Sequence, residues 1–277
     1  MIPTLPISIL SLAGTLYLLA FLLHLAAFLG PVERANRWAL VLVRVGFLVH
    51  TFFFFSEPKA EGLLIPVSTF GQVMGFFSWA LAFVYLVLLA GVQSESFGLI
   101  LAPLLALFVG VGLLNYDSGS TTVPNPLNPY FVLHLGTAFF AYASFTLSFA
   151  AALLYLIQHG ALKRKRGGPL YHKLPSLESL ERLIYSPMAW GAFLLLAAVG
   201  IGFLWSKSAF GKFWLGEPKA ITTIGVAFFY LALLYAHYVR SARGKRVIVI
   251  SLIAFLMIFV SFFGTNLFGG GFHRLLR

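Results

Sequence analysis

The stretch FGLILAPLLALFVGVGLL, residues 97–114, contains no charged side chain and is long enough to cross a membrane. A transmembrane helix needs about 20 mainly apolar residues, because the hydrocarbon core is about 30 Å thick. The whole chain follows this pattern: of its 277 residues, 60% are hydrophobic and 10% are charged, and its mean hydropathy is +0.93. Soluble domains carry about 25% charged residues. The composition therefore predicts an all-α, polytopic integral membrane protein.

Eight stretches, this one included, have the length and apolarity of a membrane span. They are residues 6–30, 38–56, 68–93, 97–114, 128–158, 188–206, 218–240 and 246–266. The alternating pattern of a transmembrane barrel is missing, so these spans are expected to be helices. The first run has no basic segment before it and no small-residue cleavage site, which favours a first span over a signal peptide. We expect one transmembrane domain over residues 1–277.

The loop charges predict how the helices are oriented. With the N-terminus outside, twelve basic residues fall in inner loops and six in outer segments, while Arg44 lies inside the second span. The inner set is Arg34, Arg37, Lys163, Arg164, Lys165, Arg166, Lys173, Arg182, Arg240, Arg243, Lys245 and Arg246. The outer set is Lys59, Lys207, Lys212, Lys219, Arg274 and Arg277. Because basic residues accumulate on the inner side, both termini are expected outside.

Charge and cysteine content exclude several classes of function. The net charge of +11 is explained by the loops that orient the spans, so we do not expect nucleic-acid binding. The chain contains no cysteine. A thiol relay, a disulfide scaffold and a metal site with cysteine ligands are therefore excluded within it.

The longest inner loop, residues 159–187, contains the basic run KRKR and one helix signal. The basic run fits a topogenic charge cluster, with a lipid contact or docking patch as the alternative. Ser176, which follows a proline, can begin a short helix. Its apolar face would consist of Leu177, Leu180 and Ile184. This pattern predicts an interfacial helix at the inner surface.

Five of the seven histidines lie in or beside the spans: His24, His50, His134, His237 and His273. Ionisable side chains at membrane depth are costly and usually functional. A single neutral imidazole can instead be a hydrogen-bonding group between helices. Five together favour ligation, because neutral imidazole is the commonest biological metal ligand and a typical axial ligand of haem iron.

Depth along the helices sorts these histidines into candidate pairs. At about 1.5 Å per residue, His24 and His237 lie about 27 and 28 Å from the outer face. They could be co-ligands of a metal or a polar pair near the inner face. His134 and His273 both lie near the outer face and could form a second pair. His50 lies in the outer half of the second span without an evident partner, and could also serve the inner site.

The outer loop WSKSAFGKFWLGEPK, residues 205–219, has the composition of a haem platform. Aromatic residues alternate there with glycines: Phe210, Gly211, Phe213, Trp214 and Gly216. Aromatic faces pack against a porphyrin plane, and glycine allows close approach to a ligand. Lysines that could meet propionate groups are Lys207, Lys212 and Lys219. An ordinary interfacial aromatic belt with a polar loop is the alternative.

Read in order, this loop resembles the tryptophan-rich motif WGxxWxWDPKE of the haem-handling cytochrome c assembly family (CcsA/CcmC type). Phe210-Gly211 stands for the first Trp-Gly, and Trp214 matches the next Trp. Glu217-Pro218-Lys219 stands for Asp-Pro-Lys. Departures from the motif occur at Gly216, Glu217 and Ala220. Together with the chain length and the LPSLESLE stretch, they are more similar to the HemX-type branch, which is linked to control of tetrapyrrole synthesis.

The histidine-bearing segments resemble the same family. His134 ends the segment NPYFVLH and is followed by Ala141-Tyr-Ala, as in the helix before the motif. His273 follows Gly264-Thr-Asn266 and resembles the family's final histidine. His237 in AHYVR and His50 in VHT are similar to helix histidines of some members.

The resemblance implies a membrane protein that takes haem from the membrane or the inner side and holds it at the outer face. His134 and His273 would be the axial ligands of a non-covalent, b-type haem, with His237 and His24 as candidate inner ligands. Its partners would be a membrane protein of the assembly system and apocytochrome c, its location the bacterial plasma membrane, and it would not be an enzyme. One alternative is a HemX-type regulator acting through the inner loop. Another is a small-molecule transporter whose histidines relay protons.

Overall fold

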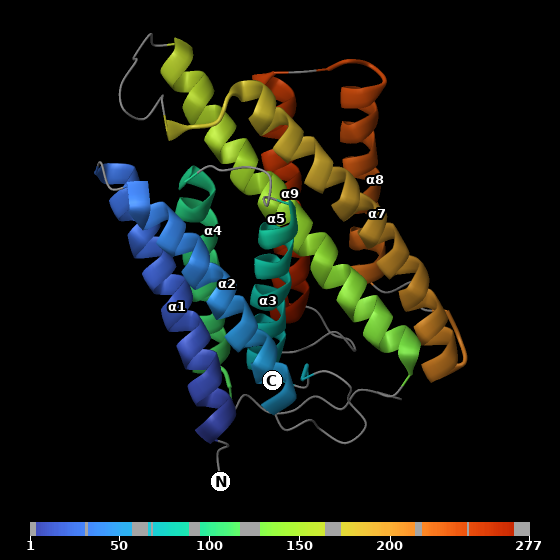
Figure 1. Ribbon diagram of the computed structural model, residues 1–277. Helices are drawn as coiled ribbons and strands as arrows, with labels where there is room; N and C mark the ends of the chain where they lie inside the picture. The colour runs from blue at the N-terminus through green and yellow to red at the C-terminus, as the bar shows by residue number, and fades with distance from the viewer. Residues whose placement is uncertain are drawn as a thin grey trace.

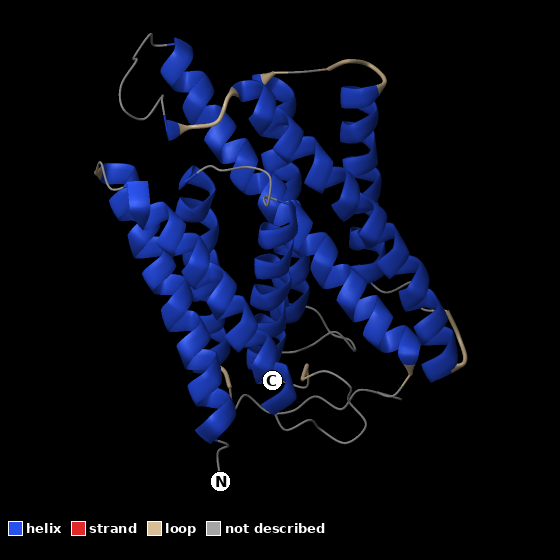
Figure 2. Ribbon diagram, in the orientation of Figure 1, coloured by secondary structure: helices blue, strands red, loops and turns tan. Residues whose placement is uncertain are grey.

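The computed structural model describes residues 4–30, 33–56, 66–67, 69–88, 95–116, 128–163, 173–213, 218–242 and 244–268. Figure 2 shows helices and loops, and no strand, in this part of the chain. The helices are α1 (Thr4–Leu29), α2 (Glu33–Ser56), α3 (Phe70–Leu88), α4 (Glu95–Leu114), α5 (Pro129–Lys163), α7 (Leu177–Phe210), α8 (Pro218–Tyr238) and α9 (Lys245–Phe268). The all-α prediction is confirmed for these ranges.

Seven of these helices, α1 to α5, α7 and α8, are long and apolar enough to cross a membrane. The remaining helix, α9, is 24 residues long, which corresponds to about 36 Å. The chain is therefore a multi-span membrane protein, and the count of eight spans stays a prediction.

The helices pack as two groups, α1 to α4 and α5 with α7 to α9 (Figure 1). In the first group, α1 packs against α2 and α4, and α3 packs against α4. In the second group, α5 packs along α7, and α8 lies against α7 and α9. Contacts of α5 with α3 and α4 join the groups, so α5 is the helix that fixes one group relative to the other.

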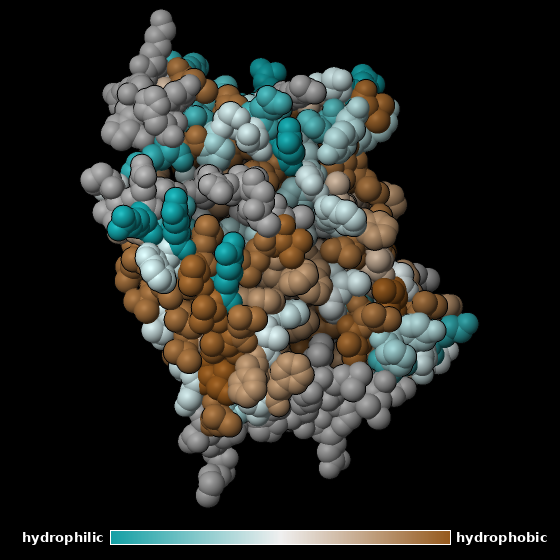
Figure 3. All heavy atoms as spheres, in the orientation of Figure 1, coloured by the Kyte–Doolittle hydropathy of each residue, from teal (hydrophilic) through white to brown (hydrophobic). Residues whose placement is uncertain are grey.

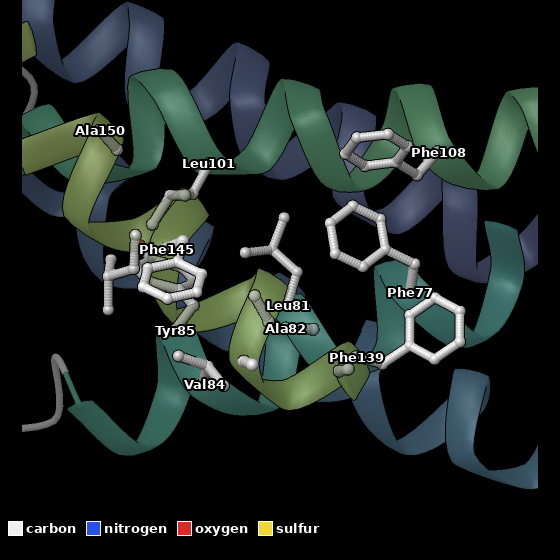
Figure 4. Close-up of a cluster of buried hydrophobic side chains, with 14 of the residues drawn as sticks. Phe77, Leu81, Ala82, Val84, Tyr85, Leu101, Phe108, Phe139, Phe145 and Ala150 are labelled. Carbon is white, nitrogen blue, oxygen red and sulfur yellow. The ribbon is translucent and has the colours of Figure 1, made fainter. Parts of the chain in front are cut away.

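The two groups meet in a buried apolar cluster formed by α3, α4 and α5 (Figure 4). The rings of Phe77 on α3 and Phe108 on α4 meet edge to face, with centroids 4.7 Å apart. Phe139 on α5 lies 6.0 Å from the same Phe77 ring. Leu81 and Leu101 are completely buried beside them. Such aromatic pairs contribute about 0.5–1.5 kcal/mol beyond their buried area, which makes this junction stable.

Large apolar side chains remain exposed around the outside of the bundle. Leu48 on α2 is 66% exposed, and Phe193 on α7 is 63% exposed. Figure 3 shows a broad hydrophobic band across the face of the molecule, with hydrophilic side chains gathered mainly toward one end. A contiguous apolar surface of this kind is unfavourable in water and suits contact with hydrocarbon.

The inner loop enters α7 differently from the prediction. Ser176 does cap a helix, since its hydroxyl accepts a hydrogen bond from the Ser179 backbone N–H at 3.2 Å. That helix continues as α7 to Phe210, so the expectation of a separate interfacial helix is wrong. The apolar face explains why, because Leu180 and Ile184 are completely buried inside the bundle instead of lying on a membrane surface.

Pro187 lies inside α7, where its missing N–H interrupts the helical hydrogen bonds. The Ser148 hydroxyl of α5 donates to the Ile184 carbonyl at 2.8 Å, about one turn before the proline. A hydroxyl from a neighbouring helix is a known means of satisfying carbonyls near a proline in membrane helices. Helix α7 can therefore run through a position where the sequence predicts a boundary.

Lys173, in the segment predicted as an inner loop, is bonded to the first helix group. Its Nζ donates to the carbonyls of Ala27, Phe28 and Gly30 at 2.9, 2.8 and 3.1 Å. The Ser96 hydroxyl of α4 donates to the Lys173 carbonyl at 3.0 Å. A cation at a helix C-terminus satisfies unpaired carbonyls and meets the negative end of the helix dipole. Lys173 thus caps α1 and is bonded to α4.

Candidate functional site

His134 lies in the second turn of α5 and is held by a hydrogen bond from its ring. Nδ1 lies 2.7 Å from the Ala198 carbonyl oxygen of α7. A carbonyl can only accept, so Nδ1 must carry the proton and donate it. In the neutral ring the lone pair is then on Nε2, which is the atom able to ligate a metal.

One face of α7 forms a seat for the His134 ring. Ala198, Gly202 and Trp205 lie about one turn apart and share that face. A Cβ on Gly202 would lie 2.8 Å from His134 Nδ1, so only glycine leaves room for the ring. The Trp205 indole lies nearly parallel to the imidazole, with centroids 6.2 Å apart and planes at 11°. The seat fixes both the position and the plane of the histidine.

The ends of α5 and α7 are tied together beside this seat. Asn128 caps α5, since its Oδ1 accepts from the Tyr130 backbone N–H at 2.9 Å. Its Nδ2 donates to the Ser208 hydroxyl of α7 at 2.7 Å. Phe131 packs on Trp205, with ring centroids 5.3 Å apart. These contacts make the junction a rigid support for His134.

Helix α7 takes up part of the expected outer loop. Residues 205–210 are helical, so the prediction that the loop begins at Trp205 is wrong. The helix ends at Gly211, which adopts a left-handed conformation with φ of 71° that favours glycine. The Phe210 ring meets Trp205 edge to face at 5.7 Å. Trp205 and Phe210 therefore form one aromatic surface beside His134.

After Gly211, the structure describes only Lys212 and Phe213 before the next gap, and both are exposed. Phe213 is 48% exposed, and the Lys207 ammonium lies 5.1 Å from its ring centroid. Lys212 is also exposed at this end. Other predicted site groups lie outside the described residues: His273, Trp214, Gly216 and the Lys219 side chain. Their roles stay predictions.

His50 lies completely buried in the first helix group. Its Nδ1 is 3.5 Å from the Tyr17 hydroxyl of α1, and its ring stacks on Phe54 at 5.8 Å. Nε2 has no hydrogen-bond partner among the described residues and lies 3.9 Å from where a Cβ on Gly75 would stand. His50 is therefore packed among α1, α2 and α3, in a different helix group from the His134 seat.

His24 is also buried in the first group, near the C-terminal end of α1. Its imidazole lies directly against the Gly98 backbone of α4, in space that a Cβ would occupy. Asn36 of α2 is close enough to influence the ring, although no hydrogen bond of normal geometry joins the two side chains. The His24 ring can pack there because glycine has no Cβ at position 98.

His237, near the end of α8, belongs to the second group. Its ring lies nearly parallel to the Tyr185 ring of α7, with centroids 3.4 Å apart and planes at 12°. Figure 1 shows α1 and α8 on opposite sides of the bundle. The structure therefore does not bring His24 and His237 together, although both lie near the same end of their helices.

Sequence reasoning missed the residues that support the ligand candidates. Ala198, Gly202 and Tyr185 were not singled out, and Trp205 was treated as part of a loop. The only signal was the spacing of small residues on α7, which allows another side chain to approach closely. That spacing does not reveal which side chain approaches.

A family model described as Cytochrome C assembly protein matches residues 67–273. The match contains the His134 seat, His237 and His273, whereas His24 and His50 precede it. It covers most of the chain and thus the whole second helix group with α3 and α4.

Individual relatives agree with this match. The chain is 29% identical over 252 residues to Protein HemX of Brevibacillus brevis, covering 90% of this chain and 92% of that protein. It is 22% identical over 232 residues to the cytochrome c biogenesis protein CcsA of Guillardia theta, covering 77% of each. The structure of the cytochrome c heme lyase CcmF has the same fold, with a TM-score of 0.66 at 18% identity. The alignment covers 99% of this chain but only 51% of that structure's chain. The chain therefore belongs to the cytochrome c assembly protein family and has HemX-like relatives within it.

Proposed function

We propose that this chain binds haem where α5 begins and α7 ends, and handles or exports it for the biogenesis of c-type cytochromes. The observation that carries the proposal is the hydrogen bond from His134 Nδ1 to the Ala198 carbonyl. Metal-ligating histidines almost always donate their other ring N–H to such an acceptor, which fixes the ring and raises the basicity of the ligating nitrogen. In this proposal His134 is one axial ligand and His273 is the other.

The surroundings of His134 suit a flat, apolar ligand that carries carboxylates. Trp205 and Phe210 offer aromatic faces, and exposed Lys207 and Lys212 offer charged partners for propionates. Haem, when bound, supplies an iron that accepts imidazole nitrogens as axial ligands. The remaining members of the proposed shelf are Gly211, Phe213, Trp214 and Lys219. Because the chain has no cysteine, it would hold haem without a thioether bond, as a b-type haem.

The chain's own residues would orient and release haem, and we assign them no enzymatic activity. Ala198 and Gly202 hold the His134 ring in one plane, so the ligating nitrogen needs no reorganisation on binding. The names of two relatives, a cytochrome c biogenesis protein and a cytochrome c heme lyase, support a role in cytochrome c assembly. By analogy, the proposed recipients are a membrane partner of the assembly system and apocytochrome c.

We further propose eight spans with both termini outside, in the plasma membrane of a bacterium. The excess of basic residues in the inner loops supports this orientation. The HemX relatives from bacteria support the location. The proposed haem site then faces the outer compartment, where a c-type apocytochrome would receive haem.

A HemX-type regulator of tetrapyrrole synthesis is the second candidate. The 29% identity to Protein HemX over 90% of this chain favours it. The Lys173 anchor also gives the basic inner loop a defined attachment to α1 and α4. Replacing residues 163–166 with glutamines should change cellular tetrapyrrole levels and spare haem binding if this candidate is right. Unchanged tetrapyrrole levels would count against it.

The test of the main proposal is a haem titration of the full chain, purified in mild detergent and followed by absorption spectroscopy. We expect a Soret band for the wild type that weakens in His134→Ala and in His273→Ala. His159→Ala is the matched control, because His159 is a half-buried histidine at the opposite end of α5. A colourless protein after haem addition would contradict the proposal and favour the transporter alternative. Loss of the band only in His24→Ala or His237→Ala would move the site to the inner end.

A further inference from the structure

Arg44 lies on an exposed face of α2, within the span Arg34–Ser56. No side chain of the described residues pairs with its guanidinium. An arginine at membrane depth is costly unless its charge reaches a polar group. Because Arg44 is exposed on the outside of the described bundle, its guanidinium is placed to meet a polar group of the surrounding membrane.

Two other arginines share that face. In a helix with 3.6 residues per turn, Arg34, Arg37 and Arg44 project within one side, and all three are exposed. Figure 3 shows hydrophilic side chains that continue from the end of α2 into the apolar band. The opposite side of α2, with Val43 and His50, is completely buried. The arginines therefore form a row on the membrane-facing side of the helix.

Side-chain direction brings Arg44 toward the membrane surface. Helical side chains lean toward the N-terminus of their helix, and α2 starts at the same bundle end as the Lys173 anchor. Trp38, 63% exposed, stands where an interfacial aromatic residue is expected. Arg44 lies about 9 Å further along the axis, a distance that a long basic side chain largely covers by extending to the interface.

Between and beyond Arg37 and Arg44 the surface of α2 is apolar. Val41 and Val45 are 38% and 41% exposed, and Leu48, just beyond Arg44, is 66% exposed. A molecule lying here would meet guanidinium groups at one end and hydrocarbon at the other. Phospholipids of the adjoining leaflet have this division, and guanidinium binds phosphate by charge-assisted, often bidentate hydrogen bonds.

We propose that the face of α2 carrying Arg37 and Arg44 binds an anionic phospholipid, with the phosphate between the two guanidinium groups. Its acyl chains lie along Val41, Val45 and Leu48. The site belongs to the leaflet at the N-terminal end of α2, and it is independent of haem binding. The bound lipid would lie on the first helix group, whereas the His134 seat belongs to the second.

Native mass spectrometry of the full chain in detergent, titrated with phosphatidylglycerol or phosphatidylcholine, tests this site. At about 1 kcal/mol per basic residue near a charged lipid surface, each of Arg37→Gln and Arg44→Gln should weaken phosphatidylglycerol binding about fivefold. The double variant should weaken it about thirtyfold. Arg240→Gln is the control, since Arg240 is exposed at the end of α8, away from α2.

Several outcomes would overturn the proposal. Wild-type affinity in the double variant would remove the arginine face as the site. Equal weakening in Arg240→Gln would reduce the effect to general surface charge. Equal affinity for phosphatidylcholine, or displacement of the lipid by an equal concentration of inorganic phosphate, would exclude an anionic-lipid site. The substituted side chains are exposed, so circular dichroism of all variants should match the wild type.

Discussion

Replacing Gly202 with alanine should disable the seat of His134 without harming the helix that forms it. The added Cβ would stand 2.8 Å from His134 Nδ1 and 2.9 Å from Cε1. Ordinary contact begins near ~3.5 Å, so the ring must move by about 0.7 Å. A displacement of that size lengthens the 2.7 Å hydrogen bond to Ala198 to about 3.4 Å, near the limit of useful geometry.

The expected effect is a loss of haem affinity of about 10- to 100-fold, the usual result of losing a group that orients a metal-ligating histidine. Haem titration by absorption gives the affinity directly. Gly200→Ala is the control, because Gly200 lies on the same helix and a Cβ there meets nothing within 4 Å. Alanine favours helix over glycine by about 1 kcal/mol, so weakened binding in Gly202→Ala could not come from loss of helix. Equal affinities of the two variants would refute the reasoning.

Three further changes have defined outcomes. Trp205→Leu should weaken haem binding several-fold and alter the Soret band, because the indole that lies parallel to the His134 ring is lost. Trp205→Phe should retain most of the haem affinity, since it keeps an aromatic ring there. Equal spectra for both variants would exclude a role of the stacked ring. Lys173→Met should lower the thermal unfolding midpoint by an amount equivalent to about 1–2 kcal/mol, because two carbonyls of α1 and that of Gly30 just after it lose their donor. An unchanged midpoint would show that water replaces Lys173. Gly98→Ala should destabilise the protein by about 1–3 kcal/mol, because the added Cβ would collide with buried His24. Gly110→Ala on the same helix is the control, since a Cβ there meets nothing within 4 Å. Equal thermal unfolding midpoints for the two variants would contradict the packing of His24.

Hydropathy locates the seven described helices that are long and apolar enough to cross a membrane, because the bilayer requires an uninterrupted apolar stretch for each. It is insufficient at Pro187, where the sequence favours a boundary between a surface helix and a span. The structure instead has one helix through that proline, with the Ile184 carbonyl accepting from Ser148. That donor lies on another helix, 36 residues away along the chain, so no local pattern reveals it.

The candidate site likewise has one part that the sequence predicts and another that depends on how the helices pack. His134 was predicted from its type and depth, which are properties of the sequence. Its partner carbonyl, Ala198, lies 64 residues away, and the contact exists only because α5 and α7 pack together. Depth also suggested that His24 and His237 form a pair. Depth gives the position along the membrane normal but not within the membrane plane, where the two helices are separated (Figure 1).

The contrast between the buried histidines follows from their surroundings. His24 and His50 are enclosed in the first helix group, whereas His134 lies half-buried at the end of the second. A ligand as large as haem needs an opening beside its axial ligand. Among the described histidines, His134 alone combines a fixed ring with exposed lysines and aromatic side chains at the same end. This difference favours the end of the bundle that carries the His134 seat as the place for haem.

Imidazole rescue would show whether His134 ligates haem from its seat on α7. Absorption spectra of the oxidised and reduced full chain would be recorded for the wild type and His134→Ala, with and without added imidazole. We expect sharp α and β bands in the reduced wild type, their loss in the variant and their return with imidazole, which would occupy the space left by the side chain. A variant spectrum identical to that of the wild type without imidazole would contradict the account.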